Sequence, residues 1–350
     1  MMTALEPILI HLTAPAPLHR QQEPVTLGIP FPAGALQHPE HLHLVHPSGK
    51  EIALQTAVLD RWKDGSIRWL LADFQAELAG EAHYQLVYGS QIRTAKPRGA
   101  LSLSEEELGC KIQNSQGEFS CRPQHDGCFL SFTPAGGGPP TRVLLEVKDQ
   151  EGHVYVPELT EIEMEHQDEV RTELCLEGAL RSRSRAWLAD LWVRLHFYAG
   201  SATVKMEVTV GNSRRAEHPG GLWDLGNGGS IYLRDASILI QSSTTTRAGT
   251  ISLEPGQPPI AFQNSVELYQ DSSGGENWKS SNHVNRHRQV PLSFRGYRVQ
   301  LDDQAQTGPR ATPILSLTSG VGLAVPEFWQ NFPKALEADA GKIIYRLFPQ

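Results

Sequence analysis

The stretch at residues 269–297, YQDSSGGENWKSSNHVNRHRQVPLSFRGY, combines amide, aromatic and cationic side chains between two apolar segments. Aromatic rings stack on sugar rings, amides bind hydroxyl groups, and guanidinium groups pair with carboxylates. These residue types therefore suit an anionic sugar. The candidate substrate-binding residues of this stretch are Glu276, Asn277, Trp278, Asn282, Asn285, Arg286 and Arg295. The alternative interpretation is a solvent-exposed connection with incidental charges, because loops are polar by default.

The same stretch contains the groups that a uronate lyase needs. Such an enzyme uses a cation beside the uronate carboxylate, a base for the C5 proton and an acid for the leaving oxygen. Arginine keeps its proton, so Arg286 and Arg295 are predicted to clamp the carboxylate. His283 and Tyr297 are the candidate catalytic residues, because an imidazole and a phenol transfer protons. The alternative for His283 is an exposed loop histidine.

A strand is predicted at residues 290–299, directly after these polar residues. Side chains alternate between the two faces of a strand. We therefore expect Arg295 and Tyr297 to share one face, which would place a carboxylate clamp beside a phenol.

A second glycine-rich segment, HPGGLWDLGNGG at residues 218–229, supplies Trp223 and Asp224 as further candidate substrate-binding residues. It lacks the strand-then-helix setting of a phosphate-binding glycine loop, so a nucleotide site is not expected. The alternative is a wide turn before a strand predicted at residues 230–239.

Several hydrolase chemistries lack their motifs in this chain. There is no Gly-x-Ser-x-Gly elbow, no His-Glu-x-x-His pair and no Walker-type loop. A glycosidase needs two carboxylates that flank the scissile bond. Glu276, Asp271 and Asp224 are candidates, and their spacing singles out no pair.

The cysteine spacing gives no reason to expect a metal centre. Cys110, Cys121, Cys128 and Cys175 form no CxxC pair, and a zinc interpretation that adds His125 lacks the usual ligand spacing. We expect buried, reduced thiols. No acidic Ca²⁺ loop is evident, so no cofactor is predicted. Ca²⁺ stays open, because a uronate lyase neutralises the uronate with Ca²⁺ or with basic side chains.

The composition limits the classes of partner. The 350 residues include 31 Lys+Arg against 39 Asp+Glu, a net charge of -8, which argues against a nucleic-acid binder. No segment approaches the uninterrupted apolar length of a membrane span. The opening MMTALEPILIHLTAPAPLHR has an acidic residue and prolines where a signal peptide has a basic region and an apolar run. We therefore expect a cytoplasmic protein that binds neither nucleic acid nor membrane.

The hydrophobic pattern predicts an all-β chain. Short β-branched and aromatic runs alternate with Gly, Pro, Asn and Asp, and helical periodicity is nearly absent. Residues 186–198 and 203–210 are predicted to form a long hairpin, which favours a large sandwich. The basic, proline-containing residues 91–98 are predicted to be a linker. The sequence thus predicts two domains, at residues 1–97 and 98–350.

Four segments together resemble the exo-rhamnogalacturonan lyase family, the YetA-like proteins. They are LDRWKDGSIRWLLADFQA, HPGGLWDLGNGGS, SSGGENWKSSNHVNRH followed by VPLSFRGYRV, and VGLAVPEFWQNFPKAL. The resemblance covers almost the whole chain, in order. It implies a small N-terminal RIFT-type β-barrel followed by a large antiparallel β-sandwich. It also implies β-elimination at a galacturonate residue of rhamnogalacturonan, the pectin backbone.

In that family a large α/α toroid follows the sandwich, whereas this sequence ends in GKIIYRLFPQ without a helical repeat. The resemblance therefore implies the first two domains of a lyase that is incomplete alone. The expected partners are an acidic pectic oligosaccharide and a separately encoded α/α toroid domain. The alternative is a non-catalytic carbohydrate-binding module for acidic oligosaccharides.

Overall fold

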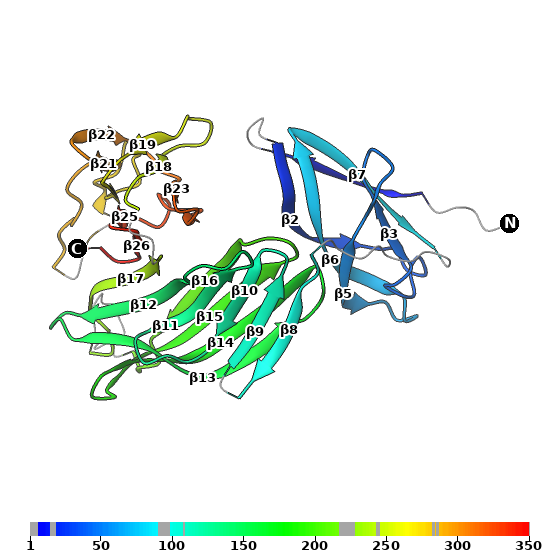
Figure 1. Cartoon of the computed structure of the whole chain (residues 1–350), viewed down its shortest axis with the longest axis horizontal. Helices are drawn as coiled ribbons and strands as arrows, with labels where there is room; N and C mark the ends of the chain where they lie inside the picture. The colour runs from blue at the N-terminus through cyan, green and yellow to red at the C-terminus, as the bar shows by residue number, and fades with distance from the viewer. Residues whose placement is uncertain are drawn as a thin grey trace.

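The structure is a computed structural model that describes residues 6–14, 19–89, 99–107, 109–216, 228–242, 246–281, 284 and 287–349. In these residues it contains strands and no α-helix, which confirms the all-β prediction. Accordingly, the described chain offers no long apolar helix of the kind that spans a bilayer. In Figure 1 the N-terminal strands, in blue, lie at one end of the molecule, and the strands coloured yellow to red lie at the other.

The N-terminal strands form a small barrel from two antiparallel sheets. One sheet has the order β1 (Ile8–Thr13), β7 (Glu81–Tyr88), β3 (Leu42–Val45), β4 (Glu51–Ile52), and the other has the order β2 (His19–Pro30), β6 (Ile67–Ala79), β5 (Leu54–Arg61). In β7 every second side chain is buried, namely Ala82, Tyr84 and Leu86. This alternation turns one face of each strand toward a hydrophobic core of the barrel.

The described residues between 99 and 349 form a two-layered β-sandwich with its own core. In the largest sheet one run of paired strands is β8 (Ser102–Glu106), β9 (Gly109–Asn114), β10 (Gly117–Cys121), β11 (Cys128–Pro134), β12 (Thr141–Asp149), β17 (Leu233–Gln241), β26 (Lys342–Arg346), β25 (Lys334–Asp339), β20 (Ser265–Gln270), β21 (Tyr297–Leu301), β22 (Gln304–Gly308). The strands β13 (Val154–His166), β14 (Arg171–Ser182), β15 (Trp187–Tyr198) and β16 (Val204–Gly211) continue from β12. A separate sheet has the order β19 (Ile260–Phe262), β18 (Gly249–Ser252), β23 (Ile314–Leu317), β24 (Gly322–Ala324).

The long hairpin predicted from the sequence is β15 paired with β16. Its turn is closed by the bond from Ser201 N to Tyr198 O, 3.3 Å. Leu191, Val193 and Leu195 alternate into the core of the sandwich, as the sequence pattern requires. The hairpin prediction is therefore confirmed. The predicted domain boundary between residues 97 and 98 lies outside the described residues.

The strand predicted at residues 290–299 is wrong over most of its length, because β21 begins only at Tyr297. The preceding Gly296 has φ +74°, and a Cβ there would lie 2.1 Å from Gly308 O. That backbone conformation interrupts the alternation of a strand. Arg295 is exposed in the bend before β21 whereas Tyr297 is buried, so the two do not share a strand face.

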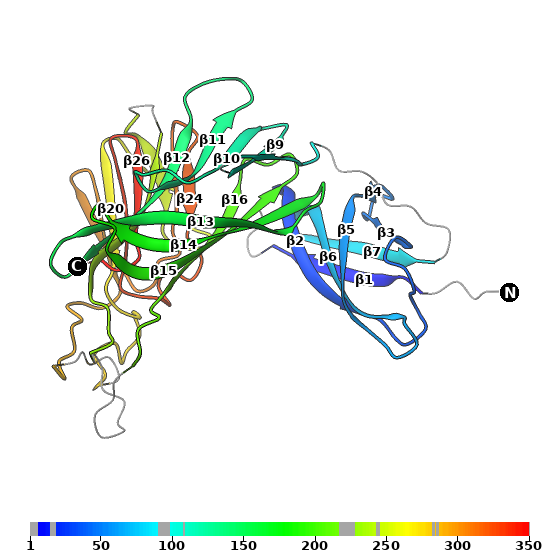
Figure 2. The ribbon, with the colours of Figure 1, turned by 90° about the horizontal axis from the view of Figure 1, so that it is seen from below.

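The barrel and the sandwich are joined by buried polar contacts. Arg171 of β14 places its Nε 2.9 Å from Asp73 Oδ1 of β6, and its Nη2 donates to Asp73 Oδ2 at 3.3 Å. The Nε contact is a charge contact without hydrogen-bond alignment. Arg171 N donates to Gln55 Oε1 (2.7 Å), and Gln75 Nε2 donates to Ala199 O (2.5 Å). In Figure 2 the ends of β13 and β14 meet the barrel near β2 and β6.

His196 of β15 extends this contact into the sandwich. Its Nδ1 lies 3.1 Å from Arg171 Nη1 and 3.5 Å from Glu173 Oε2. Burial lowers the pKa of His196, with Arg171 and Lys205 acting in the same direction and Glu173 and Glu207 opposing it. The imidazole is therefore neutral in the folded protein near neutral pH.

Replacing Asp73 by Asn should destabilise the protein by about 1–3 kcal/mol, because the buried guanidinium of Arg171 loses its charge partner on the barrel and keeps only Glu173, whose Oε2 lies 2.5 Å from Nη1. The free energy of unfolding in urea measures the effect. Asp60→Asn is the matched control, since Asp60 forms an exposed ion pair with Arg68 (3.0 Å) and should change stability by less than about 1 kcal/mol. Equal losses in the two variants would contradict this role of Asp73.

Protonation of His196 should make stability depend on pH. The unfolded chain binds a proton at this imidazole below about pH 6.5, whereas burial depresses the pKa in the folded state. The free energy of unfolding should therefore fall as pH is lowered from about 7.5 to about 5.5. Urea titrations across this range should give a shallower fall for His196→Gln. If the free energy of unfolding of His196→Gln fell with pH as steeply as that of the unaltered chain, His196 would not contribute to the pH dependence.

Candidate functional site

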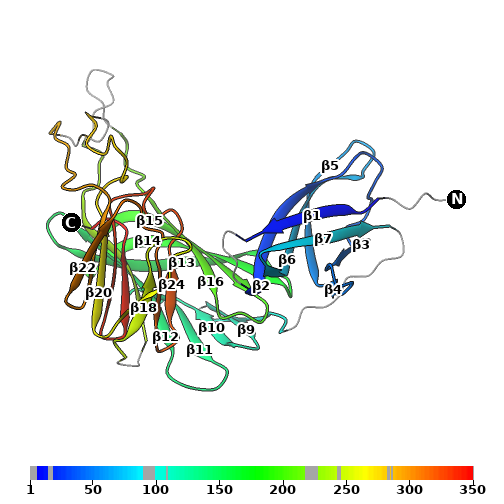
Figure 3. The ribbon, with the colours of Figure 1, turned by 90° about the horizontal axis from the view of Figure 1, so that it is seen from above.

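Three chain connections meet at one end of the large sheet. The register pairs Gln270 with Tyr297 and Lys334, and Tyr297 with Gly308. The end of β20, the start of β21, the end of β22 and the start of β25 therefore lie side by side. The described residues between 271 and 296, together with residues 309–313 and 325–333, leave the sheet here, and Figures 2 and 3 show the connection after β20 projecting past the strand ends.

Gln270, the last residue of β20, ties two of these connections together. Its Nε2 donates to Ser272 O (2.7 Å) and to Pro309 O (3.0 Å), and its Oε1 accepts from Ala311 N (3.0 Å). The side chain is fully buried, so each of these bonds satisfies a group that water does not reach. The amide fixes residues 271–272 against residues 309–311.

Asp271 and Ser272 hold the far end of the same connection. Asp271 Oδ2 accepts from Ser293 N (2.7 Å) and Phe294 N (2.9 Å), and Ser272 Oγ accepts from Gly296 N (2.8 Å). Asp271 is only 4 % exposed. Its carboxylate thus anchors backbone N–H groups and does not face a substrate as a glycosidase carboxylate would.

Two surface arginines donate hydrogen bonds to the carbonyl groups of consecutive residues in the connection after β20. Arg295 Nε donates to Gly274 O (2.8 Å), and Arg310 Nε donates to Ser273 O (3.2 Å). The Arg310 guanidinium also lies over the ring of Trp329, 4.4 Å from its centroid. Both arginines are exposed. We call Arg295, Arg310 and Trp329 the arginine surface; each guanidinium carries further N–H donors that can bind an anion.

The sequence prediction included Arg295 but missed Arg310 and Trp329. Neither stands near residues 269–297 in the chain, and only the pairing of β21 with β22 and of β20 with β25 brings them to the same sheet end. Trp329 does lie in the last of the four family-like segments, which was the available signal.

The other predicted substrate-binding residues are placed as follows. Glu276 and Asn277 are exposed in a turn, and Ser280 N donates to Asn277 O (3.0 Å). Trp278 is half-buried, and Lys279 Nζ lies over its ring at 4.6 Å from the centroid. The remaining candidates lie outside the described residues: Asn282, His283, Asn285, Arg286, Trp223 and Asp224.

Tyr297, one of the two candidate catalytic residues, is 4 % exposed. Its hydroxyl donates to Glu254 Oε1 at 3.2 Å. Burial, followed by the nearby Glu254 carboxylate, raises the pKa of Tyr297 to about 12. The phenol is thus protonated near neutral pH, which suits a proton donor and not a base. A catalytic role for Tyr297 stays a prediction.

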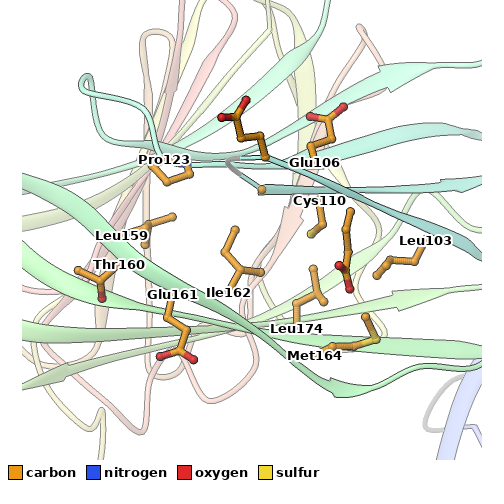
Figure 4. Close-up of a pocket in the computed structure, with 13 residues that line it drawn as sticks. Leu103, Glu106, Cys110, Pro123, Leu159, Thr160, Glu161, Ile162, Met164 and Leu174 are labelled. Atoms are coloured by element: carbon orange, nitrogen blue, oxygen red, sulfur yellow. The ribbon is translucent and has the colours of Figure 1, made fainter.

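A pocket of about 480 Å³ opens between β8–β9 and β13–β14 (Figure 4). Cys110 points into it from one layer, and Ile162 and Leu174 point into it from the other. Its lining also includes carboxylates, which are Glu105, Glu106, Glu107 and Glu161. Glu106 is paired with Lys111 (3.0 Å), and Glu106 and Glu161 point away from the interior in Figure 4. No Lys or Arg among the described residues lines the pocket to pair with a uronate carboxylate. The pocket is lined by none of the predicted site residues, so the arginine surface is the better candidate for an anionic sugar.

The four cysteines are free and buried, which confirms the expectation of buried reduced thiols. Cys110 and Cys121 face each other across β9 and β10. Burial raises the pKa of Cys128 and that of Cys175. His125, which a zinc interpretation would add, is exposed.

The N-terminal barrel is the part of the chain that a known family describes. Residues 10–88 match the PcRGLX-like N-terminal RIFT barrel domain. The match runs from β1 to β7 and confirms that this two-sheet unit is a RIFT barrel. It supports a relationship to the N-terminal part of rhamnogalacturonan lyase-like proteins. A search of the curated proteins finds no match.

Beyond the RIFT barrel, Gly274 lies where the connection after β20 passes close to Pro309. Its φ is +68°, and a Cβ there would lie 1.9 Å from Pro309 O, whereas a Cβ at Gly275 would meet nothing closer than 3.5 Å. Gly274→Ala should therefore lower the free energy of unfolding by about 1–3 kcal/mol and weaken the hydrogen bond from Arg295 Nε to the carbonyl of residue 274. Gly275→Ala should leave the free energy of unfolding nearly unchanged. Urea unfolding of both variants measures the difference. Similar stabilities would show that this close approach does not constrain the loop.

Proposed function

We propose that this chain is the N-terminal part of a polysaccharide lyase that cleaves rhamnogalacturonan by β-elimination at a galacturonate residue. The observation that carries the proposal is the match of residues 10–88 to the PcRGLX-like RIFT barrel. The family-like segments of the sandwich support it further, because they include the connection that presents Arg295.

The proposed ligand is an acidic pectic oligosaccharide bound at the arginine surface. The chain carries a net charge of -8, so an anionic sugar needs a local group of cations. Arg295 and Arg310 supply two guanidiniums that are held by consecutive carbonyls of one backbone segment. A galacturonate carboxylate would pair with these donors, and the indole of Trp329 offers an adjoining apolar ring.

In the proposed reaction a base removes the C5 proton of galacturonate. The C4–O bond then breaks, a C4–C5 double bond forms, and the leaving oxygen takes up a proton from an acid. His283 is the proposed base. Tyr297 is the proposed acid, because its phenol keeps its proton near neutral pH. The arginine surface would offset the negative charge that develops at the uronate.

A second candidate function is a non-catalytic carbohydrate-binding module. The burial of Tyr297 favours it, because the phenol hydroxyl is directed to Glu254. In this case the arginine surface binds the oligosaccharide and no bond is broken. A separately encoded α/α toroid domain is the proposed partner if the chain is part of a lyase.

A lyase assay separates the two functions. The chain, alone and together with an α/α toroid polypeptide encoded downstream, is incubated with rhamnogalacturonan, and the ultraviolet absorbance of the unsaturated uronate is followed. A rise in absorbance that Tyr297→Phe reduces supports the lyase. Binding without any rise in either mixture leaves the binding module as the function.

Binding at the arginine surface should depend on charge. Arg295→Ala and Arg310→Ala should each weaken the binding of an acidic rhamnogalacturonan oligosaccharide by about tenfold or more, because each removes a charge-assisted hydrogen bond. Isothermal titration calorimetry measures the affinity, with the distant, exposed Arg68→Ala as the control. The affinity should fall as salt is added. Equal affinity for a neutral galactan would contradict an ionic site.

A further inference from the structure

Three metal-ligating side chains lie together on the outer face of the RIFT barrel. His11 of β1 is directly opposite His83 of β7, and Thr13 is opposite Glu81. Ile10 and Ala82, the sequence neighbours of these residues, are buried in the barrel core. Because side chains alternate along a strand, His11, Glu81 and His83 all project outward from one patch of paired strands.

The three side chains are already close to one another. The imidazole rings of His11 and His83 are stacked, with centroids 4.3 Å apart and planes inclined by 10°. His11 Nε2 lies 3.7 Å from Glu81 Oε2. One ligand atom from each of the three residues lies within 4.8 Å of the others. The side chains of His11 and Glu81 are 51 % and 64 % exposed, so small rotations about their side-chain bonds meet little resistance.

We propose that His11, Glu81 and His83 form a binding site for Zn²⁺ or a similar divalent transition metal. Imidazole nitrogen and carboxylate oxygen are ligands that such ions prefer, at about 2.0–2.2 Å. The paired strands fix the backbone positions of all three residues before the metal binds. Three protein ligands leave a fourth position open to water or to a carboxylate from outside the chain.

A second group of potential ligands, Asp149, Glu151 and His153, is a weaker candidate. The Asp149 carboxylate already accepts from His153 N (2.8 Å), from Tyr155 OH (3.0 Å) and, at 3.1 Å, pairs with His153 Nδ1. These bonds shape the turn between β12 and β13, and a metal ion would have to replace them. No such bonds between the ligand atoms and the backbone are described for His11, Glu81 and His83.

The proposed metal site is independent of the arginine surface. β1 and β7 belong to the barrel at one end of the molecule, and β20, β21 and β22 belong to the opposite end (Figure 1). Loss of metal binding would thus leave the proposed function untouched, and failure to bind a pectic oligosaccharide would leave the metal site untouched.

Calorimetric titration of the whole chain with ZnCl₂ at about pH 7.5 tests the site. We expect one ion to bind per chain, with affinity reduced at least about tenfold in His83→Gln and in Glu81→Gln. His19→Gln is the matched control, because His19 is an exposed histidine of the same barrel outside the group. Its affinity should equal that of the unaltered chain.

Thermal unfolding provides a second measurement on the same proteins. Zn²⁺ should raise the melting temperature of the unaltered chain and of His19→Gln, and should do so less in His83→Gln and Glu81→Gln. Equal Zn²⁺ affinity in all four proteins would overturn the proposal. So would a loss of binding in His153→Gln alone, because that result would assign the ion to the turn between β12 and β13. If His83→Gln does not fold, Glu81→Gln decides.

Discussion

The buried contact between Asp73 and Arg171 is the interaction on which the relation between the barrel and the sandwich depends. The barrel and the sandwich each have their own hydrophobic core. Because the hydrophobic effect is non-directional, these separate cores do not fix the orientation of the barrel against the sandwich. Charge contacts and hydrogen bonds are directional. The buried guanidinium of Arg171 pairs with Glu173 of its own strand and with Asp73 of the barrel, so the Asp73 contact specifies where β6 lies against β14.

The need of buried polar groups for partners also determines the arginine surface. The described residues between 271 and 296 leave the sheet without regular pairing, yet part of their backbone is buried, and buried N–H and C=O groups need partners. Gln270 and Asp271 supply those partners from the end of β20. Side chains at and directly after the end of β20 thus fix the position of the irregular connection. Arg295 and Arg310 owe their common position to this arrangement and to the strand register, more than to the loop residues around them.

The sequence predicts those parts of the structure that depend on the pattern of consecutive residues. The alternation of β15 and β16 is a property of consecutive residues, so the hairpin is readable without any tertiary information. The position of Arg310 beside Arg295 depends on strand pairing between distant segments and has no local signature. For Asp271 the local pattern is misleading, because the polar stretch around it suggests an exposed side chain. Its carboxylate is buried, since it accepts the N–H groups of residues 293 and 294, which have no strand partner.

Charge distribution explains why an anionic sugar would favour the end of the sheet over the opening between its layers. The pocket between β8–β9 and β13–β14 has an apolar interior that would suit a sugar ring, but no Lys or Arg of the described residues lines it to pair with a carboxylate. At the strand ends the cations are instead exposed and close to an indole. Since the chain as a whole is negative, its long-range field repels a polyanion, and attraction acts only within about a Debye length of the arginines. The proposed binding there would consequently depend on close contacts with a few sugar residues, as at a subsite and not at a general polyanion surface.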